Sequence, residues 1–505
     1  MNMKQAKQYL KDTVQIYLKK DEYGEYCIPV VRQRPLFLLG APGIGKTAVV
    51  EQVAEELGIA LVSYSMTHHT RQSALGLPFI VHKEYEGKEF DISEYTMSEI
   101  IASVYEVMEK SKVKQGILFL DEINCVSETL APSMLQFLQY KVFGRHQVPE
   151  GWVIVTAGNP PEYNRSVREF DIVTMDRMRV LMVEEDFAAW REYAVNKGIH
   201  NAIISYLEQK KEHFYIVETT VGGKDYVTAR GWEDLSQVLR LYESEELPVD
   251  ETLVGQYLHC DRVVKEYTAY YELYCKYKRD YQIEAILSGE AGEKTVQKAK
   301  DAPFDERLSI LGILIERLLV DIRENLELSD VLSALLAPLK AVGERARKGA
   351  DISEILDMLA DRQNAFETLM IQKKEAGALS DIEKRKNRRM IQFLTDTQSR
   401  VRMESLKDAE AAFGVIKQCF DGQVRSMREE NGQVQRRMHA LFDFVEQAFS
   451  DGNEMLLLVT ELTINEYSSR FISMFGSDDF LKHQEEMMLS ERQSTLMGKI
   501  AELEL

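Results

Sequence analysis

The stretch GAPGIGKT, residues 40–47, decides the fold of this chain. It matches the pattern G-x-x-x-x-G-K-[ST] and lies between a short apolar run, residues 35–40, and a helical pattern, residues 47–57. In that setting the glycines let backbone N–H groups turn towards phosphate oxygens, and the positive end of the new helix faces the same anion. We therefore predict a phosphate-binding loop, with a chance glycine-rich turn as the alternative.

The pattern also assigns roles within the loop. Lys46 would reach the outer phosphates of a nucleotide, and the hydroxyl of Thr47 would bind Mg²⁺. We therefore expect ATP and Mg²⁺ as ligands. The predicted nucleotide contacts are Gly40, Ala41, Pro42, Gly43, Ile44, Gly45, Lys46, Thr47 and Ala48.

A second motif, ILFLDEIN at residues 117–124, places two carboxylates at the end of an apolar strand. Ligands bind at the carboxyl ends of parallel strands. Asp121 would hold Mg²⁺ through water, and Glu122 would orient and polarise the attacking water, because phosphoryl transfer needs positioned charge more than covalent chemistry. A solvated turn is the alternative for an isolated Asp-Glu pair.

A third apolar run, residues 152–159, ends at Asn159 and is followed by two prolines. An amide at this position can hydrogen-bond the γ-phosphate or the attacking water. Taken alone, Asn159 is equally well a turn asparagine. Its order and spacing after Asp121 favour the functional interpretation.

Apolar runs and helical patterns alternate through the first half of the chain. Continuous apolar strands that alternate with helices predict a parallel sheet covered on both faces. The predicted fold class is therefore α/β, a P-loop NTPase sheet with a helical lid, followed by an all-α C-terminal domain. The strand-like runs are residues 35–40, 60–66, 116–122, 152–159 and 179–183.

Composition sets the broad class. A chain of 505 residues with 45% hydrophobic content predicts at least two globular domains. The net charge of -20 disfavours a nucleic-acid partner. The N-terminus lacks the apolar core of a signal peptide, no apolar stretch is long enough for a membrane span, and the five cysteines show no paired spacing. We therefore expect a soluble, cytoplasmic protein with no membrane partner.

The composition changes near residue 250, because all three tryptophans and nine of the eleven prolines precede it. Proline breaks helices, so its scarcity afterwards favours long helices. We expect antiparallel helices over residues 380–450, with a break at Asn431-Gly432. The predicted domains are a nucleotide-binding subdomain at 1–185, a helical lid and exit helix at 186–286, a linker at 287–303 and a helical bundle at 304–505.

In order, GAPGIGKT, LDEIN, TAGNPPEYN, MDRMRV and VTARGWEDLS resemble the motifs of AAA+ ATPases, and most of all the MoxR-like branch, in which the second motif commonly reads DEIN. The resemblance covers residues 35–242. It implies an α/β subdomain with a helical lid that hydrolyses ATP in a ring, usually a hexamer. It also implies a chaperone-like role on a protein client, with von Willebrand factor A-type proteins as the suggested partners.

The resemblance also assigns site residues. Asn159 resembles sensor 1, and Arg230 at the start of a lid helix resembles sensor 2, which touches the γ-phosphate in cis. Arg177 resembles the arginine finger that reaches the neighbouring subunit's site. A surface salt bridge is the alternative for each arginine. Three nearby residues are alternatives for the finger: Arg165, Arg168 and Arg179.

The chain departs from many members of the branch at Cys125, where they carry an arginine, so a contact in trans there is lost or replaced. Two segments predict β-hairpins, residues 77–93 with the turn at Glu86-Gly87, and residues 140–151. In related ATPases, loops at these places face the pore or a client. Plain surface hairpins are the alternative.

Two functions of different classes fit these motifs. One is ATP-driven remodelling of a partner protein. The other is a nucleotide-dependent scaffold or switch with little turnover. Glu122 favours the first, because a pure switch does not need a residue that polarises water.

Overall fold

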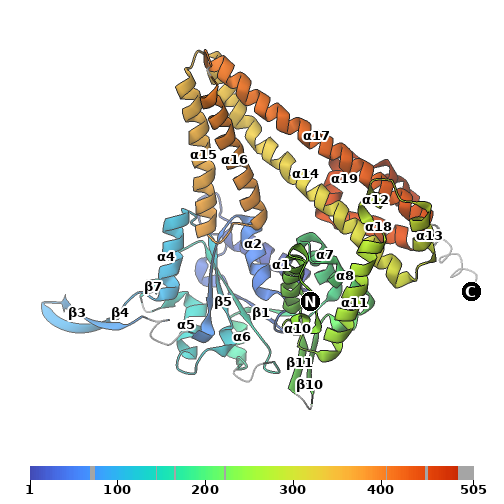
Figure 1. Ribbon diagram of the computed structural model, residues 1–505. Helices are drawn as coiled ribbons and strands as arrows, with labels where there is room; N and C mark the ends of the chain where they lie inside the picture. Colours follow the sequence, from blue (N-terminus) through green and yellow to red (C-terminus); the bar gives the residue numbers. More distant parts are fainter. Residues whose placement is uncertain are drawn as a thin grey trace, which may run out of the picture. The chain divides into compact units, whose positions relative to one another are not determined.

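The structure is a computed structural model of the chain. It describes residues 1–68, 74, 76–143, 145–163, 167–220, 223–404, 406–449 and 453–486. The chain divides into two compact units (Figure 1). The first unit is Met1–Ala189 with Asn364–Arg388, and the second is Trp190–Gln363 with Arg389–Leu505. Most of the expected lid and bundle therefore falls in one unit, whereas residues 364–388 fall with the nucleotide-binding part.

A five-stranded parallel sheet forms the centre of the first unit, in the order β2-β5-β8-β1-β9. The central strands consist mainly of buried apolar residues, as expected for a sheet covered on both faces. The predicted α/β class, with a P-loop NTPase sheet, is confirmed. The strands are β1 Leu36–Gly40, β2 Ala60–Ser65, β5 Gly116–Asp121, β8 Trp152–Gly158 and β9 Arg179–Val183.

Helices cover both faces of this sheet (Figure 1). Helix α1 (Met3–Leu18) packs on α2 (Lys46–Leu57), and α2 packs on β2 and β5. Helices α4 (Glu99–Ser111) and α5 (Ala131–Tyr140) share a hydrophobic core with alternate strand residues such as Leu118. The period of two along each strand thus sends neighbouring side chains to opposite faces.

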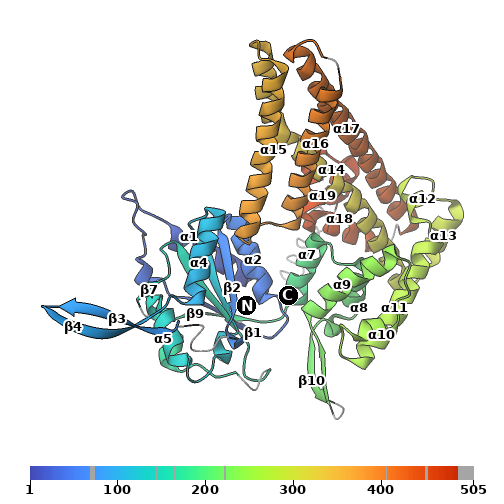
Figure 2. The ribbon, with the colours of Figure 1, turned by 60° about the vertical axis from the view of Figure 1, so that its left-hand side comes forward.

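Both predicted hairpins are present in the first unit. Strands β3 (Pro78–Tyr85) and β4 (Lys88–Tyr95) pair antiparallel and extend away from the sheet (Figure 2). The turn residues Glu86 and Gly87 have φ of 52° and 78°. Positive φ at both turn positions matches the twist of a tight hairpin. The second hairpin pairs the short strands β6 (Val142–Phe143) and β7 (His146–Gln147).

The second unit begins with small helices around an aromatic core. The stripe of tyrosines in α11 faces this core, where Tyr267 and Tyr274 are almost fully buried and the ring of Tyr267 lies against Trp232 of α9. The elements are α7 Phe187–Lys197, α8 Asn201–Gln209, β10 Ile216–Thr220, β11 Gly223–Val227, α9 Ala229–Ser244, α10 Glu251–Gly255 and α11 Asp261–Asp280. Figure 2 shows the β10–β11 hairpin beside these helices.

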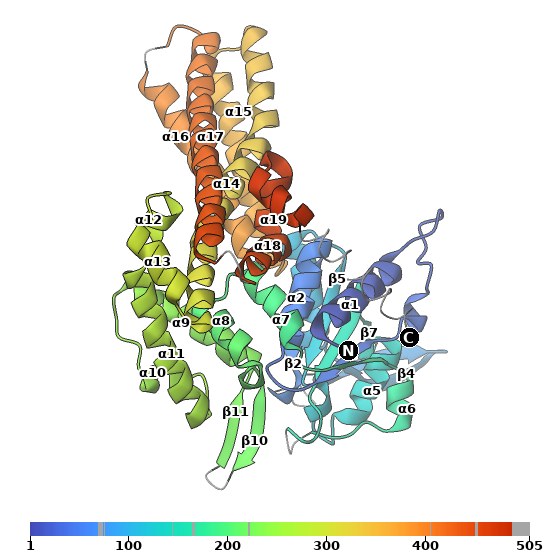
Figure 3. The ribbon, with the colours of Figure 1, turned by 90° about the vertical axis from the view of Figure 1, so that its right-hand side faces the viewer.

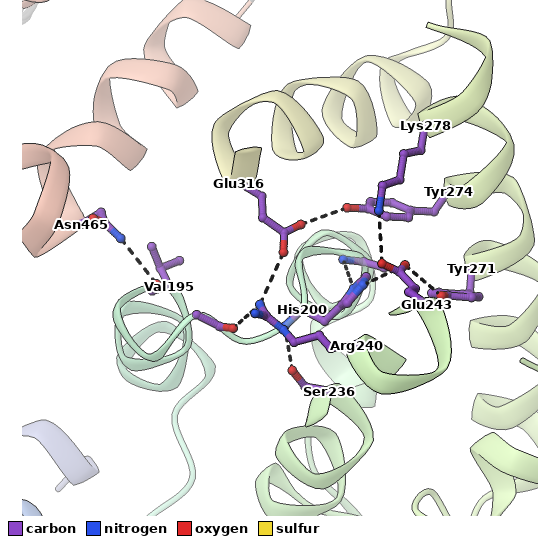
Figure 4. Close-up of polar contacts among 12 residues, drawn as sticks. Val195, His200, Ser236, Arg240, Glu243, Tyr271, Tyr274, Lys278, Glu316 and Asn465 are labelled. Carbon is purple, nitrogen blue, oxygen red and sulfur yellow. Dashed lines mark hydrogen bonds and ion pairs between the residues drawn. The ribbon is translucent and has the colours of Figure 1, made fainter. Parts of the chain in front are cut away.

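A partly buried polar network joins three of these helices (Figure 4). Glu243 of α9 accepts hydrogen bonds from His200 at 3.1 Å, Tyr271 of α11 at 3.0 Å and Lys278 of α11 at 3.1 Å. The Nδ1 atom of His200 accepts from the backbone N–H of Ala202, so Nε2 carries the proton that is donated to Glu243. Burial opposes the charged carboxylate, but these hydrogen bonds and the positive charge of Lys278 outweigh it and lower the pKa of Glu243 to about 2.

Long helices dominate the rest of the second unit, together with several short ones (Figure 3). Helices α14 and α17 pack along one another, and α18 and α19 pack against α14. None of the helices within the described residues is long and apolar enough to cross a membrane. The elements are α12 Ile283–Leu287, α13 Glu293–Asp301, α14 Phe304–Arg347, α15 Ile352–Glu375, α16 Asp381–Met403, α17 Ala409–Ala448, α18 Glu454–Ile464 and α19 Glu466–Phe475. Helices α15 and α16 each run on into residues of the first unit.

Residues 287–303, the predicted linker, include helix α13, in which Ala299 is buried and Lys298 lies over the ring of Tyr281. The break expected at Asn431-Gly432 is corrected. Helix α17 runs unbroken through Asn431-Gly432. Packing of α17 on α14 outweighs the cost of about 1 kcal/mol for an internal glycine. The actual break precedes Asp408, which caps α17 by accepting the N–H of Ala411.

Candidate nucleotide-binding site

The loop between β1 and α2 has the backbone that the motif predicts. Gly40 ends β1 so close to β9 that a Cβ atom there would lie 2.4 Å from the carbonyl oxygen of Val183. Gly45 caps α2 with a φ of 100°, which side chains rarely tolerate. The chain therefore turns sharply into the N-terminus of α2, where free N–H groups and the helix dipole favour an anion.

Lys46 joins this loop to the end of β8. Its side chain is buried, and its Nζ atom donates hydrogen bonds to the carbonyl oxygens of Gly40 at 2.8 Å and Ala41 at 2.7 Å. The same atom donates to Oδ1 of Asn159 at 2.8 Å. The lysine of the first motif and the asparagine of the third, 113 residues apart, therefore lie in direct contact.

Thr47 and Asp121, the two predicted Mg²⁺ ligands, also meet. The hydroxyl of Thr47 donates to Oδ2 of Asp121 at 3.1 Å. Hydroxyl and carboxylate oxygens suit Mg²⁺, which usually keeps several waters and shares phosphate oxygens with a substrate. Among the described residues, no group of three or more His, Cys, Asp or Glu side chains could hold a metal ion.

Glu122 is held in place by two hydroxyl groups that the sequence did not single out. Its Oε2 atom accepts hydrogen bonds from Ser65 at 3.0 Å and from Thr67 at 3.0 Å. Its φ of 55° is left-handed, an uncommon backbone for glutamate that is typical of functional turns. The parallel pairing of β2 with β5 brings these hydroxyl groups to Glu122. It sets Ser65, the last residue of β2, opposite Asp121, the last residue of β5.

The candidate arginine fingers have different surroundings. Arg177 follows helix α6 (Ile172–Asp176) and is half-buried, and Arg179 opens β9 and is exposed. Within the described part of the chain, neither guanidinium makes a hydrogen bond or ion pair. Arg168 instead pairs with Glu128 at 2.6 Å. Arg165 lies outside the described residues.

Arg230 lies in the first turn of α9 and is exposed. It belongs to the second compact unit, whereas the loop at residues 40–47 belongs to the first. The assignment of Arg230 as a sensor therefore stays a prediction.

A phosphate-type loop at the carboxyl end of a parallel sheet, beside an acidic pair and an asparagine, defines a P-loop NTPase site. Comparison with known families narrows this class. Residues 36–175 match the family model described as ATPase family associated with various cellular activities (AAA). The match supports a nucleotide-dependent AAA+ ATPase. No curated protein matches the chain.

Proposed function

We propose that this chain hydrolyses ATP as an AAA+ protein of the MoxR-like type, that it works as a hexameric ring, and that it remodels a protein client. The hydrogen bond from Lys46 to Asn159 carries the proposal, because it brings the first and third motifs together beside the acidic pair. The AAA family match at residues 36–175 supports the ATPase part. The branch, the ring and the client rest on the sequence resemblance.

The side chains fit hydrolysis of the terminal phosphoanhydride. The oxygen of a water molecule attacks the γ-phosphorus, the bond from that phosphorus to the bridging oxygen breaks, and ADP and phosphate leave. Glu122 takes the proton of the water, while Lys46 and Asn159 stabilise negative charge on the phosphoryl oxygens. Mg²⁺ on Thr47 and Asp121 would neutralise charge on the β- and γ-phosphates when bound.

Steady-state hydrolysis tests the ATPase proposal. The parent should turn over ATP only with Mg²⁺, and Glu122→Gln should keep ATP binding but lose turnover by about 10²-fold, since water activation is lost. The exposed Glu109→Gln on α4 is the matched control and should keep the parental rate. Parental turnover in Glu122→Gln would contradict the assigned role. A parent that binds ATP without turnover would favour the scaffold alternative.

A trapping experiment tests the client. Glu122→Gln held in ATP should retain the partner that the parent releases after hydrolysis. We expect a protein of the von Willebrand factor A type among the captured partners. Equal recovery of every protein with Glu122→Gln and with the binding-deficient Lys46→Ala would contradict ATP-dependent client binding.

A further inference from the structure

Asn124 contacts the carboxyl end of β8 directly. Its side chain is 5% exposed, and it follows Glu122 in the short helix η3 (Ile123–Cys125). Its Nδ2 atom donates a hydrogen bond to the backbone carbonyl oxygen of Asn159 at 2.7 Å. Asn159 in turn accepts the hydrogen bond of Lys46 through its side chain. Asn124 thus fixes the backbone of the residue whose amide faces Lys46.

The oxygen atom of the Asn124 side-chain amide is held by packing rather than by a hydrogen bond. The Oδ1 atom of Asn124 is buried without a hydrogen-bond partner among the described residues. It faces Gly158, where a Cβ atom would lie 2.4 Å from it. In glycine this position holds only a hydrogen, so the oxygen rests against a Cα–H group. The backbone oxygen of Asn124 accepts the N–H of Arg168 at 2.9 Å, which also anchors the segment before α6.

We propose that Asn124 is a positioning residue for ATP hydrolysis: it sets the backbone of Asn159 and so aims the Asn159 amide at the reacting γ-phosphate. The proposal rests on the ATPase function above. It gives the asparagine of the DEIN motif a role distinct from those of Asp121 and Glu122. It also explains why Gly158 precedes Asn159.

Kinetics of Asn124→Leu and Asn124→Ala test this role. Neither side chain can donate to Asn159, and alanine adds no bulk. We expect kcat to fall about tenfold while the dissociation constant for ATP stays within about twofold of the parent, because the lost interaction orients the reacting group. The exposed Ser127→Ala, just after η3, should match the parent. Parental kcat in both Asn124 variants would overturn the proposal.

A steric cycle gives a readout that needs no turnover. Gly158→Ala should lower the melting temperature by forcing its Cβ atom against Asn124. Adding Asn124→Ala should remove that clash. The double variant should therefore lose less melting temperature than the two single variants lose in total. Strictly additive losses would overturn the contact. If the ATPase proposal itself were wrong, the parent protein would show no ATP turnover. The melting temperatures of the cycle would not depend on that result.

The loop between α15 and α16, residues 376–380, belongs to the first unit and packs into its core. Ala376 and Ala378 in this loop are 2% and 8% exposed, and both are part of the hydrophobic core under the sheet. The carbonyl oxygen of Ala376 accepts the N–H of Leu61 at 2.9 Å. Because β2 is the edge strand, the loop caps a backbone group that the sheet leaves unpaired (Figure 2).

This contact lies on the strand that leads to Glu122. Leu61 is in β2, and the same strand ends at Ser65, whose hydroxyl holds the carboxylate of Glu122. Helix α15 runs from the loop into the second unit without interruption, so the helical region is mechanically joined to this strand.

We infer that the loop at residues 376–380 couples the helical region to ATP hydrolysis by fixing β2 and, through Ser65, the position of Glu122. This inference also rests on the proposed ATPase function. A force on α15 reaches the strand edge through Ala376. Release of the loop loosens the end of β2 and lowers turnover without touching the nucleotide loop.

Buried charges in the loop test the coupling. Ala376→Glu and Ala378→Glu should release the loop, which speeds hydrogen exchange of the peptide that contains Leu61. We expect kcat to fall about threefold or more with ATP affinity unchanged, the signature of a misplaced reacting group. Lys374→Glu, an exposed change to the same residue type, should leave both readouts unaltered.

A milder variant keeps the test valid if a buried glutamate prevents folding. Lys373 pairs with Glu383 across the base of the loop, so Lys373→Ala loosens it without burying a charge. Faster exchange around Leu61 together with a parental or higher kcat would overturn the coupling. A parent protein that does not bind ATP would instead reject the proposed function.

Discussion

At the scale of single residues, Lys46 has the most specific surroundings. Its ammonium group contacts two carbonyl oxygens of its own loop and the amide oxygen of Asn159, all within 2.8 Å. Lys46→Ala removes the only charge that the loop at residues 40–47 carries. We expect it to abolish tight ATP binding, measured by titration with a fluorescent ATP analogue, because the outer phosphates lose their counter-charge.

The fold should survive this substitution, because the sheet core does not include Lys46. Circular dichroism and the melting curve should therefore stay close to those of the parent. Lys110→Ala, an exposed lysine on α4, is the control for loss of a positive charge. Near-parental ATP affinity in folded Lys46→Ala would reject the P-loop assignment.

At the scale of elements, glycines inside the long helices give opposite predictions. A Cβ atom at Gly432 of α17 would meet only the end of Arg436 at 3.7 Å, so Gly432→Ala should raise stability by about 0.5–1 kcal/mol. A Cβ atom at Gly343 of α14 would lie 2.4 Å from the ring of Phe413. Gly343→Ala should therefore lower stability by about 1–3 kcal/mol, despite the same gain in helix propensity.

Thermal melting of the two variants tests this contrast between an open glycine and one at a helix contact. Gly422→Ala, also in α17 and with no atom within 4 Å of its Cβ position, should behave like Gly432→Ala. Equal shifts for Gly343→Ala and Gly432→Ala would mean that α14 and α17 do not pack at Phe413.

The network around Glu243 predicts a stability that depends on pH. Its pKa of about 2 lies below the ordinary value of 4.5, so the folded state favours the carboxylate. The resulting stability is complete above pH 4.5 and is lost as the pH falls from there towards 2. Glu243→Gln should thus lower the melting temperature at pH 6. The difference in melting temperature between the variant and the parent should shrink as the pH falls from about 5 to about 3, because the parent then loses its charged carboxylate.

Exposed carboxylates should not show this narrowing gap. Glu245→Gln, two residues further along and exposed, is the control. A gap for Glu243→Gln that stays constant with pH would show that the carboxylate is not preferentially charged in the fold.

At the scale of the whole molecule, Arg177 predicts that activity depends on assembly. Its guanidinium makes no hydrogen bond or ion pair within the part of the chain that the structure describes, although it interacts electrostatically with the carboxylate of Asp171. Arg177→Ala should keep ATP binding but lose hydrolysis by a factor on the order of 10³, because a finger stabilises the transition state. Hydrolysis per subunit should also rise with protein concentration until rings are complete.

Mixed rings provide the decisive measurement. Lys46→Ala subunits carry a dead site with an intact finger, and Arg177→Ala subunits carry the reverse. Activity should reappear on mixing, where a good loop meets a good finger. Arg177→Ala with parental activity would move the role to Arg179, Arg165 or Arg168. No recovery on mixing would argue against a finger that acts in trans.

The sequence by itself determined the fold class, the strands and the motif residues that local patterns encode. The runs at residues 116–122 and 152–159 each contain four consecutive apolar residues, ILFL and WVIV, so burial on both faces predicted them as central parallel strands. Glycines at fixed offsets identified the loop at residues 40–47, and the Glu86-Gly87 turn identified a hairpin. Each of these signals lies within a few neighbouring residues, where backbone preference and periodicity act directly.

Only the tertiary structure decided features that depend on distant partners. Ser65 and Thr67 hold Glu122 because β2 and β5 align in register, and Ala376 caps Leu61 although more than three hundred residues separate them. Helix α17 passes through Gly432 because packing on α14 outweighs a local penalty. Hydrogen-bond partners and packing energies of this kind arise between segments that the folded chain brings together, and a local pattern does not encode them.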